Sequence, residues 1–367
     1  MEPTKILLIA GTRPEIIKLA PVYLDLKTRP VDVELCVTAQ HRGLLDQMLH
    51  VFGMVADYDL DLMRSGESLA DLGARALGAT TDLLSELHPD RVVVQGDTTS
   101  AAMASIAAHH HSIPVAHVEA GLRTYDRLAP FPEESNRRII AAVSDLHFAP
   151  SEEAARALLA EGFSPGAVHM VGNTIADALE LIAPIAAGCA DPILQRLGIE
   201  DPRSVVMVTL HRREGLGGGF RRVCAGVAEL STRFAEAQFV LPVHPNPSVA
   251  AEVGLMLSNI SNVHLIEPLD YLTFIDLLRQ SQLVITDSGG VQEEAPALGV
   301  HALVVREKTE RREGIDAGVA TLVGFDSARL VAEAARILAS PTTKVPRALY
   351  GDGLSAARIG NVLVGLA

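Results

Sequence analysis

Short apolar segments alternate with helix-length segments along almost the whole chain, and this alternation restricts the possible folds more than any other feature. Segments such as KILLIAG (5–11) and RVVVQGD (91–97) are apolar along most of their length rather than at every second residue. Strands buried on both faces have this pattern, and they occur in parallel sheets that helices cover on both sides. The strands that we predict span residues 5–11, 31–39, 91–97, 114–121, 145–150 and 168–172, and then 204–211, 238–244, 262–268, 283–289, 301–305 and 320–324.

Twelve predicted strands are more than one open twisted sheet usually contains, so we predict an α/β chain with two doubly wound domains. The stretch between residues 172 and 203 is rich in Gly, Pro and Asp, as APIAAGCADP and GIEDPRS show, and is the best candidate for a boundary. The sequence therefore predicts a first domain over residues 1–172 and a second over 173–353. The segment of about 354–367 is expected to form a helix that packs back on the first domain.

The charge and cysteine content exclude several classes of function. The 31 Lys and Arg against 45 Asp and Glu give a formal net charge of −14, which argues against a partner such as nucleic acid or a membrane surface. Cys36, Cys189 and Cys224 are far apart and favour neither a disulfide framework nor a zinc site. The N-terminal segment lacks the apolar core of a signal peptide, and no stretch reaches the ~18–20 apolar residues of a membrane span. We expect a soluble cytoplasmic protein.

Polar side chains lie at or just after the end of nearly every predicted strand. Ligands of doubly wound sheets bind beyond the carboxyl ends of the strands, so these residues are the first candidates for a site. They are Arg13, Lys18, Asp97, Glu119, His211, His244 and Ser288. So many polar residues on one edge of each sheet indicate a ligand-binding site, although any single member could be an ordinary loop residue.

The segment LVITDSGGVQEEAPALG (283–299) predicts a buried strand, a glycine turn and a helix. Glycines let the backbone approach an oxyanion, and the start of a helix carries about half a unit of positive charge. Glu293 and Glu294 follow at once, and they either cap the helix or accept hydrogen bonds from a ribose diol. The functional interpretation is a nucleoside diphosphate, with phosphates on the turn and ribose on a glutamate.

The turn GTRPEIIK (11–18) contains one glycine, so it is neither a GxGxxG nor a Walker motif. Arg13 and Lys18 would instead bring positive side chains to the ligand. The histidine run at 109–111 is expected to be an exposed helix end rather than a metal site.

Three acids, Asp97, Glu119 and Glu133, lie at or near strand ends of the first predicted domain. Carboxylates in different environments can divide into a general acid and a general base. The structural alternative for each is an ion pair with an arginine, the candidates being Arg123, Arg137 and Arg138. From the second domain, His211 and His244 could bind phosphate or move a proton, or could be structural.

Taken together, these motifs resemble the UDP-N-acetylglucosamine 2-epimerase family in its non-hydrolysing bacterial branch. The matches run in order along nearly the whole chain: GTRPEIIKLAPV, TAQHRGLLDQML, QGDTTS, HVEAGLRT, PFPEESNRR, ADLHFAPS, VGNTIAD, HRRE, VHPNP, HLIEPLDY, TDSGGVQEEAPALG, TER and YGDG. The resemblance implies a GT-B fold of two Rossmann-like domains with the active site between them, and a homodimer.

The resemblance also assigns residues to roles. It implies that UDP is held by Arg13, Lys18, His211, Ser288, Gly289, Gly290, Glu294 and Arg311, with Glu294 on the ribose and with Leu269 and Phe274 beside the uracil. It implies that Asp97, Glu119 and Glu133 are catalytic carboxylates, with His211 assisting at the phosphate. The implied reaction needs neither NAD nor a metal, so no cofactor is expected.

The implied chemistry is the reversible conversion of UDP-N-acetylglucosamine to UDP-N-acetylmannosamine by anti elimination of UDP and its re-addition to 2-acetamidoglucal. The product would serve cell-surface polysaccharide synthesis. The alternatives are a hydrolysing epimerase that releases N-acetylmannosamine and UDP, a GT-B glycosyltransferase, and a non-catalytic UDP-sugar sensor. The three retained acids and His211 argue against a sensor.

Several positions depart from the family pattern. Gly215, Arg312 and His301 stand where the family usually has Asn, Pro and Pro. Gly43 and Gly66 stand where bacterial members have a polar residue and an arginine in the stretches beside a second, activating UDP-N-acetylglucosamine. We therefore expect activation by substrate to be weakened or absent.

Overall fold

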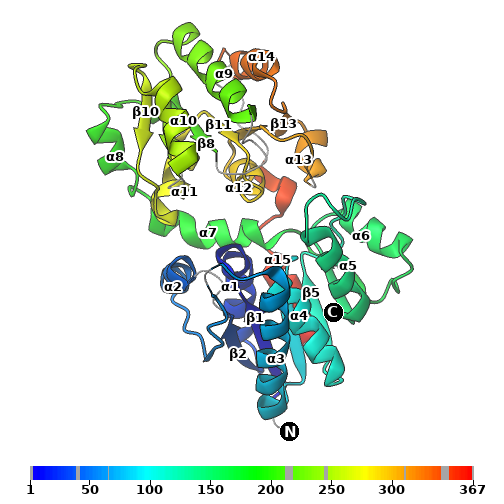
Figure 1. Ribbon diagram of the computed structural model, residues 1–367. Helices are drawn as coiled ribbons and strands as arrows, with labels where there is room; N and C mark the ends of the chain where they lie inside the picture. The colour runs from blue at the N-terminus through cyan, green and yellow to red at the C-terminus, as the bar shows by residue number, and fades with distance from the viewer. Residues whose placement is uncertain are drawn as a thin grey trace. The chain divides into compact units, whose positions relative to one another are not determined.

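The computed structural model describes residues 3–38, 42–64, 66–210, 218–243, 247–309, 311–339 and 347–365. The chain divides into two compact units, Met1–Leu181 with Tyr350–Ala367, and Ile182–Leu349. Each unit is an α/β structure built on one parallel sheet, as the apolar runs predict (Figure 1). Within the described residues, no helix is both long and apolar enough to cross a membrane.

The first unit is built on a seven-stranded sheet in the order β3-β2-β1-β4-β5-β6-β7. Its strands are β1 (Lys5–Ala10), β2 (Asp32–Val37), β3 (Tyr58–Asp59), β4 (Arg91–Gln95), β5 (Val115–Val118), β6 (Leu146–Ala149) and β7 (Val168–Met170). Its helices are α1 (Arg13–Lys27), α2 (Arg42–Val51), α3 (Leu69–Leu87), α4 (Thr99–His110), α5 (Glu133–Val143), α6 (Glu152–Ala160), the first part of α7 (Thr174–Ala186) and α15 (Ser355–Leu363).

The second unit is built on a six-stranded sheet in the order β10-β9-β8-β11-β12-β13. Its strands are β8 (Val205–Thr209), β9 (Gln238–Pro242), β10 (Val263–Ile266), β11 (Leu283–Thr286), β12 (His301–Val304) and β13 (Ala320–Leu322). Its helices are the second part of α7, α8 (Asp191–Arg196), α9 (Gly219–Arg233), α10 (Pro247–Leu257), α11 (Tyr271–Gln280), α12 (Val291–Ala297), α13 (Arg312–Asp316) and α14 (Ser327–Leu338), with a 3₁₀ turn at Pro202–Ser204. A second 3₁₀ turn, Arg347–Tyr350, spans the return of the chain to the first unit.

Each of the twelve predicted strands contains an observed strand, and one observed strand was not predicted. Strand β3 is only two residues long and pairs with Cys36 and Val37 at the edge of the sheet. A strand of this length has no periodic apolar pattern, so the sequence offers no signal for it. The predicted strands also extend past the observed ends, because the polar residues that follow each strand belong to turns.

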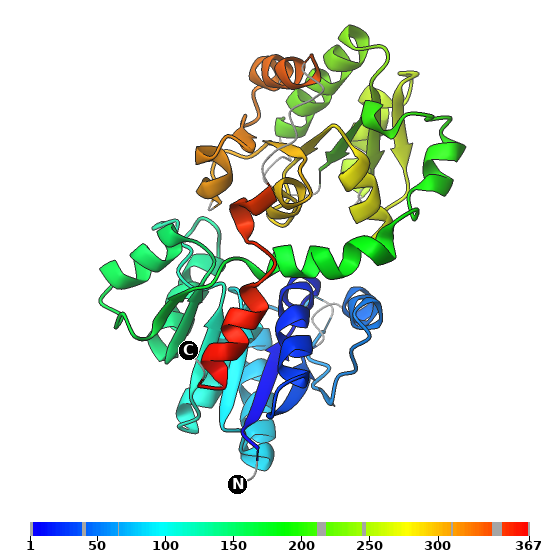
Figure 2. The same cartoon turned by 180° about the vertical axis from the view of Figure 1, so that it is seen from behind.

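The division of the chain falls within the stretch of residues 172–203 that was predicted to hold the boundary, but not at the predicted residue. The chain passes from the first unit to the second between Leu181 and Ile182, inside α7, rather than at residue 172, and it returns to the first unit at Tyr350 rather than at about 354. The helix is continuous through the division, so the Gly- and Pro-rich segment that suggested a linker partly belongs to α7 and α8. Helix α15 belongs to the first unit, where it lies beside α1 (Figure 2). Arg29, in the segment after α1, donates to the Ala357 carbonyl oxygen at 3.1 Å and to Asn361 Oδ1 at 2.8 Å.

Local sequence accounts for the close packing around the first sheet. Helix α4 begins at a Thr98 cap, whose hydroxyl accepts from the Ala101 N–H, and it buries a row of alanines that lets it lie close to β4 and α3. Gly121 follows β5 with φ +92, and a Cβ there would lie 2.2 Å from the Ala154 carbonyl oxygen. Only glycine fits this approach of α6 to the segment after Glu119.

In each sheet the strand order reverses between two central strands. The reversals lie between β1 and β4 in the first unit and between β8 and β11 in the second. Helices leave such a pair of strands in opposite directions, which opens a crevice at the carboxyl ends where ligands of doubly wound sheets bind. The residues that follow these four strands are therefore the first candidates for a ligand site.

Candidate functional site

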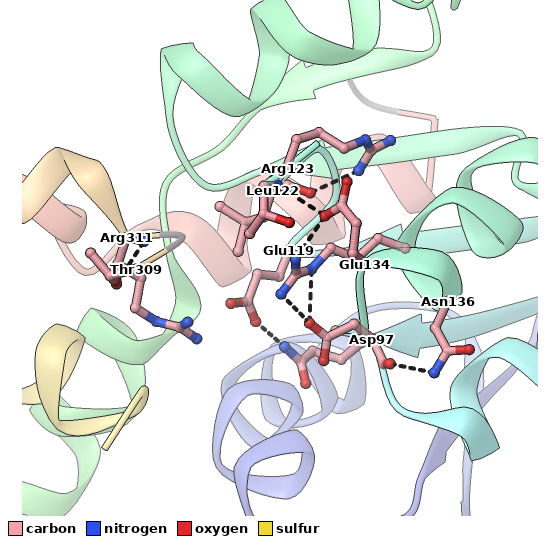
Figure 3. Close-up of polar contacts among 12 residues, drawn as sticks. Asp97, Glu119, Leu122, Arg123, Glu134, Asn136, Thr309 and Arg311 are labelled. Atoms are coloured by element: carbon pink, nitrogen blue, oxygen red, sulfur yellow. Dashed lines mark hydrogen bonds and ion pairs between the residues drawn. The ribbon is translucent and has the colours of Figure 1, made fainter. Parts of the chain in front are cut away.

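Asp97 follows β4 and is held by the first turns of α5. Arg137 donates to Asp97 Oδ2 from Nε at 2.8 Å and from Nη2 at 2.7 Å. Asn136 Nδ2 donates to the Asp97 carbonyl oxygen at 2.9 Å (Figure 3). The ion pair that the sequence offered as the structural alternative is thus present. It does not bury the acid, because 28% of the Asp97 side chain remains exposed.

The turn that carries Asp97 is supported from β5 by a buried histidine. His117 Nε2 lies 2.7 Å from the Gly96 carbonyl oxygen. Burial lowers the pKa of His117 to about 3, so the ring is neutral near pH 7 and Nε2 is the protonated nitrogen that donates this bond. His117 therefore fixes the position of the turn and has no proton to exchange in the neutral range.

Glu119 follows β5 in an unusual backbone conformation, with φ +66. A non-glycine residue in this left-handed region costs about 1 kcal/mol or more, and such residues concentrate at functional sites. Its carboxylate forms an ion pair with Lys18 Nζ at 2.7 Å, and Gln95 Nε2 also donates to it. The side chains of Lys18 and Glu119 are both less than a tenth exposed. Lys18, which the resemblance assigns to UDP, is therefore directly paired with a candidate catalytic acid.

Two adjacent glutamates open α5 and differ in their surroundings. Glu133 is half-buried, and its Oε2 has no hydrogen-bond partner within the described part of the chain. Glu134 is fully buried and accepts from the backbone N–H of Thr124 at 2.9 Å and from Arg137 Nη1 at 3.1 Å (Figure 3). Burial favours the neutral acid, but these donors outweigh it and lower the pKa of Glu134. The sequence predicts a catalytic role for Glu133 and none for Glu134.

Glu15 is a second buried acid whose role could not be predicted from the sequence. Its Oε2 accepts from the Gly11 N–H at 3.0 Å, and its Oε1 accepts from the Thr98 hydroxyl at 2.9 Å. It therefore ties the turn after β1 to the turn after β4, on the two sides of the strand-order reversal. Burial raises the pKa of Glu15 from 4.5 to about 7, against the effect of these donors.

The raised pKa of Glu15 predicts a pH-dependent loss of stability. Folding favours the protonated acid, so its contribution is complete below about pH 4.5 and is lost as the pH rises towards 7. The difference between these pKa values corresponds to roughly 3 kcal/mol. Glu15→Gln should therefore raise the urea midpoint of the protein at pH 8 and change it little at pH 5. Glu86→Gln, at an exposed position on α3, is the control, and an equal shift at both pH values would contradict the prediction.

In the second unit, a glycine turn follows β11. The Ser288 N–H donates to the Thr286 hydroxyl at 3.0 Å, Gly289 is buried, and Gly290 is the exposed residue before α12. Gln292 donates to the Ser288 carbonyl oxygen at 3.1 Å, which holds the turn against the helix. The exposed Gly290 lets a ligand approach the backbone without meeting a side chain.

Glu293 and Glu294 point to different partners. Glu293 Oε1 accepts from Arg311 Nε at 2.8 Å, and both side chains are largely buried. Glu294 Oε1 accepts from the Tyr271 hydroxyl at 2.8 Å. Arg311 is further oriented through Thr309, whose hydroxyl accepts from the Arg311 N–H at 3.2 Å (Figure 3). Glu293 thus positions an arginine, while Glu294 is held by a neutral hydroxyl.

The remaining predicted site residues lie at or near the starts of helices or outside the described residues. Arg13 is the half-buried first residue of α1. Leu269 and Phe274 are half-buried just before and within α11. His211 and His244 lie outside the described residues. Residues 109–111 end α4, and the residues that the structure describes contain no cluster of three His, Cys, Asp or Glu that could hold a metal ion.

Comparison with known proteins agrees with this architecture. The two doubly wound parallel sheets define a GT-B fold. The similar solved structures have the same fold. The family model for UDP-N-acetylglucosamine 2-epimerase matches residues 25–364. The chain belongs to this family.

Individual relatives cover nearly the full length. The UDP-N-acetylglucosamine 2-epimerase of Yersinia pestis is 43% identical over 364 residues, which is 97% of each chain. The crystal structure of the Neisseria meningitidis UDP-GlcNAc 2-epimerase bound to UDP-GlcNAc has a TM-score of 0.91 and 39% identity, and the match covers 99% of this chain and 100% of that one. The Methanocaldococcus jannaschii enzyme in complex with UDP-GlcNAc and UDP has a TM-score of 0.86 and 32% identity, with 99% and 100% coverage.

Proposed function

We propose that this chain interconverts UDP-N-acetylglucosamine and UDP-N-acetylmannosamine by epimerisation at C2 without hydrolysing the sugar nucleotide. The observation that carries the proposal is the placement of three acids in the first unit: Asp97 follows β4, Glu119 follows β5, and Glu133 is the first residue of α5. The family match over residues 25–364 and the relatives crystallised with UDP-GlcNAc and UDP support the same ligand.

The proposed UDP site uses the second unit for most of its contacts. The diphosphate would lie against the turn of Ser288, Gly289 and Gly290, with positive charge from Arg13, His211 and Arg311. Glu294 would accept hydrogen bonds from the ribose diol, and Leu269 and Phe274 would border the uracil. The resemblance also places Lys18 with this set, whereas its ion pair with Glu119 supports a role beside the carboxylates.

The chemistry follows from the substrate. C2 of the sugar has no neighbouring carbonyl, so direct deprotonation is difficult. We infer that a carboxylate takes the C2 proton while the C–H electrons form a C1–C2 double bond and the C1–O bond breaks, releasing UDP and 2-acetamidoglucal. UDP then adds back to C1 while an acid protonates C2 on the other face. Each positioned acid or base contributes about 10²–10⁴-fold, and donors on the leaving diphosphate stabilise the charge that develops there.

The proposed reaction requires neither NAD nor a metal. We propose that a cytoplasmic homodimer carries it out.

Two alternative reactions would give different products from UDP-N-acetylglucosamine. A hydrolysing epimerase would add water and release N-acetylmannosamine and UDP, and a GT-B glycosyltransferase would need an acceptor. With Gly43 and Gly66 in the stretches that face the activator in bacterial members, we propose that UDP-N-acetylglucosamine is at most a weak activator.

Separation of the products distinguishes these reactions. The protein is incubated with UDP-N-acetylglucosamine alone, and the sugar nucleotides are resolved by anion-exchange chromatography. We expect UDP-N-acetylmannosamine to appear and to reach a minority plateau. Stoichiometric free UDP and N-acetylmannosamine would indicate hydrolysis, and an unchanged substrate would overturn the proposal.

A further inference from the structure

The beginning of α5 contacts the loops that carry the proposed catalytic acids. Arg137 is shared between two carboxylates: its Nε and Nη2 donate to Asp97 Oδ2, and its Nη1 donates to Glu134 Oε2. Asn136 holds the Asp97 backbone from the same turn of helix. Asp97 is therefore fixed through its carbonyl oxygen and through one side-chain oxygen, both from α5.

Glu134 ties the loop before α5 at both of its ends. Its carboxylate accepts from the N–H groups of Thr124 and Tyr125 at 2.9 and 3.2 Å. Its own N–H donates to the Pro130 carbonyl oxygen at 3.2 Å. The loop between these points leads directly into Glu133, so Glu134 sets the position of a second proposed catalytic acid.

Glu134 and Arg137 form an ion pair that is buried from solvent. Glu134 is fully buried, and only 4% of the Arg137 side chain is exposed. A buried carboxylate of this kind needs a buried cation, and a guanidinium can serve two acids at once because its N–H groups point in fixed directions in one plane. Both contacts with Asp97 fall on Oδ2, and the side chain of Asp97 is 28% exposed.

We propose that Arg137 and Glu134 are positioning residues for the reaction. Arg137 holds Asp97 by Oδ2, so that the proton exchanged between Asp97 and C2 of the sugar passes through Oδ1. Glu134 keeps Arg137 in the orientation that achieves this. The inference rests on the proposed function, since it assigns to Asp97 a proton transfer within the epimerisation.

A double-mutant cycle tests the inference. Arg137→Lys keeps the charge but loses the planar fork, and we expect kcat to fall about 10–100-fold while KM and the Kd for UDP change less than about threefold. If Arg137 acts through Asp97, the same change in an Asp97→Asn background should lower kcat by less than about threefold further. Arg138→Lys is the matched control, because Arg138 also contacts Glu134, at 3.4 Å, but is 42% exposed; its kcat should stay near that of the wild type.

The possible results separate a failure of the positioning role from a failure of the proposed function. Additive losses in the cycle, or an Arg137→Lys protein as active as Arg138→Lys, would overturn the positioning role even though the wild type epimerises. If Arg137→Lys does not fold, Glu134→Gln replaces it in the same cycle with the same expectation of a reduced kcat and non-additivity. A wild type that leaves UDP-N-acetylglucosamine unchanged would instead overturn the proposed function, and this inference with it.

Discussion

Asp97→Asn is expected to lower kcat for epimerisation by about 10²–10⁴-fold, which is the contribution of one positioned acid or base. The amide has the shape of the carboxylate, and its oxygen can still accept from Arg137, so the turn after β4 should keep its position. The side chain can no longer exchange a proton at the pH of the reaction. The measurement is steady-state turnover of UDP-N-acetylglucosamine, with the melting temperature recorded alongside.

Binding of UDP separates this role from a structural one. The proposed UDP contacts belong mostly to the second unit, so the Kd for UDP measured by calorimetry should change less than about threefold in Asp97→Asn. Asp82→Asn, at an exposed position on α3, controls for the loss of a negative charge. If Asp97→Asn weakened UDP binding as much as it reduced turnover, the proton-transfer role would be wrong.

Glu294→Ala is expected to raise the Kd for UDP about 10–100-fold, because a hydrogen bond to a charged group contributes about 1.5–3 kcal/mol. Removing Glu294 leaves the Tyr271 hydroxyl without the carboxylate that accepts from it, which adds a modest loss of stability. Tyr271→Phe removes only the supporting contact and should weaken UDP binding less. Calorimetric titration with UDP measures both effects.

Glu293→Ala is compared with Glu294→Ala for its effect on stability. Its partner Arg311 is only 13% exposed, and removing one member of a buried ion pair typically costs about 3–5 kcal/mol. We therefore expect Glu293→Ala to lower the melting temperature far more than Glu294→Ala. Loss of Glu293 can also weaken UDP binding through Arg311, so the ribose assignment is judged on the second glutamate: if Glu294→Ala left the Kd for UDP unchanged, that assignment would be mistaken.

The arrangement of the strands could be predicted because a strand buried on both faces has a continuous apolar sequence. Every predicted run contains an observed strand, and the polar residues directly after the runs, such as Asp97, Glu119 and Ser288, do follow strand ends. The edge strand β3 was missed because two residues carry no pattern. The Gly- and Pro-rich stretch of 172–203 does contain the division of the chain, but its exact position inside α7 could not be predicted because a continuous helix carries no signal of a boundary.

The supporting residues of the site were harder to predict than the acids themselves. Glu15 and Glu134 each stand in a segment that was examined, but their roles depend on partners such as Thr98, 83 residues from Glu15. Spacing in the sequence does not reveal which of two adjacent glutamates faces the interior. The sequence offered three arginines as possible partners of Asp97, and only the fold shows that Arg137 pairs with it, while Arg123 pairs with Glu161 and Arg138 with Glu134.

Proton NMR of the wild-type protein with UDP-N-acetylglucosamine in D₂O tests the central claim most directly. Elimination of UDP and its re-addition remove the C2 proton and replace it from solvent. The account therefore predicts UDP-N-acetylmannosamine with deuterium at C2, and gradual deuteration of C2 in the remaining substrate, with no NAD or metal added. Epimerised product that retains its original C2 proton would contradict proton removal at C2 by the carboxylates, and with it the proposed mechanism.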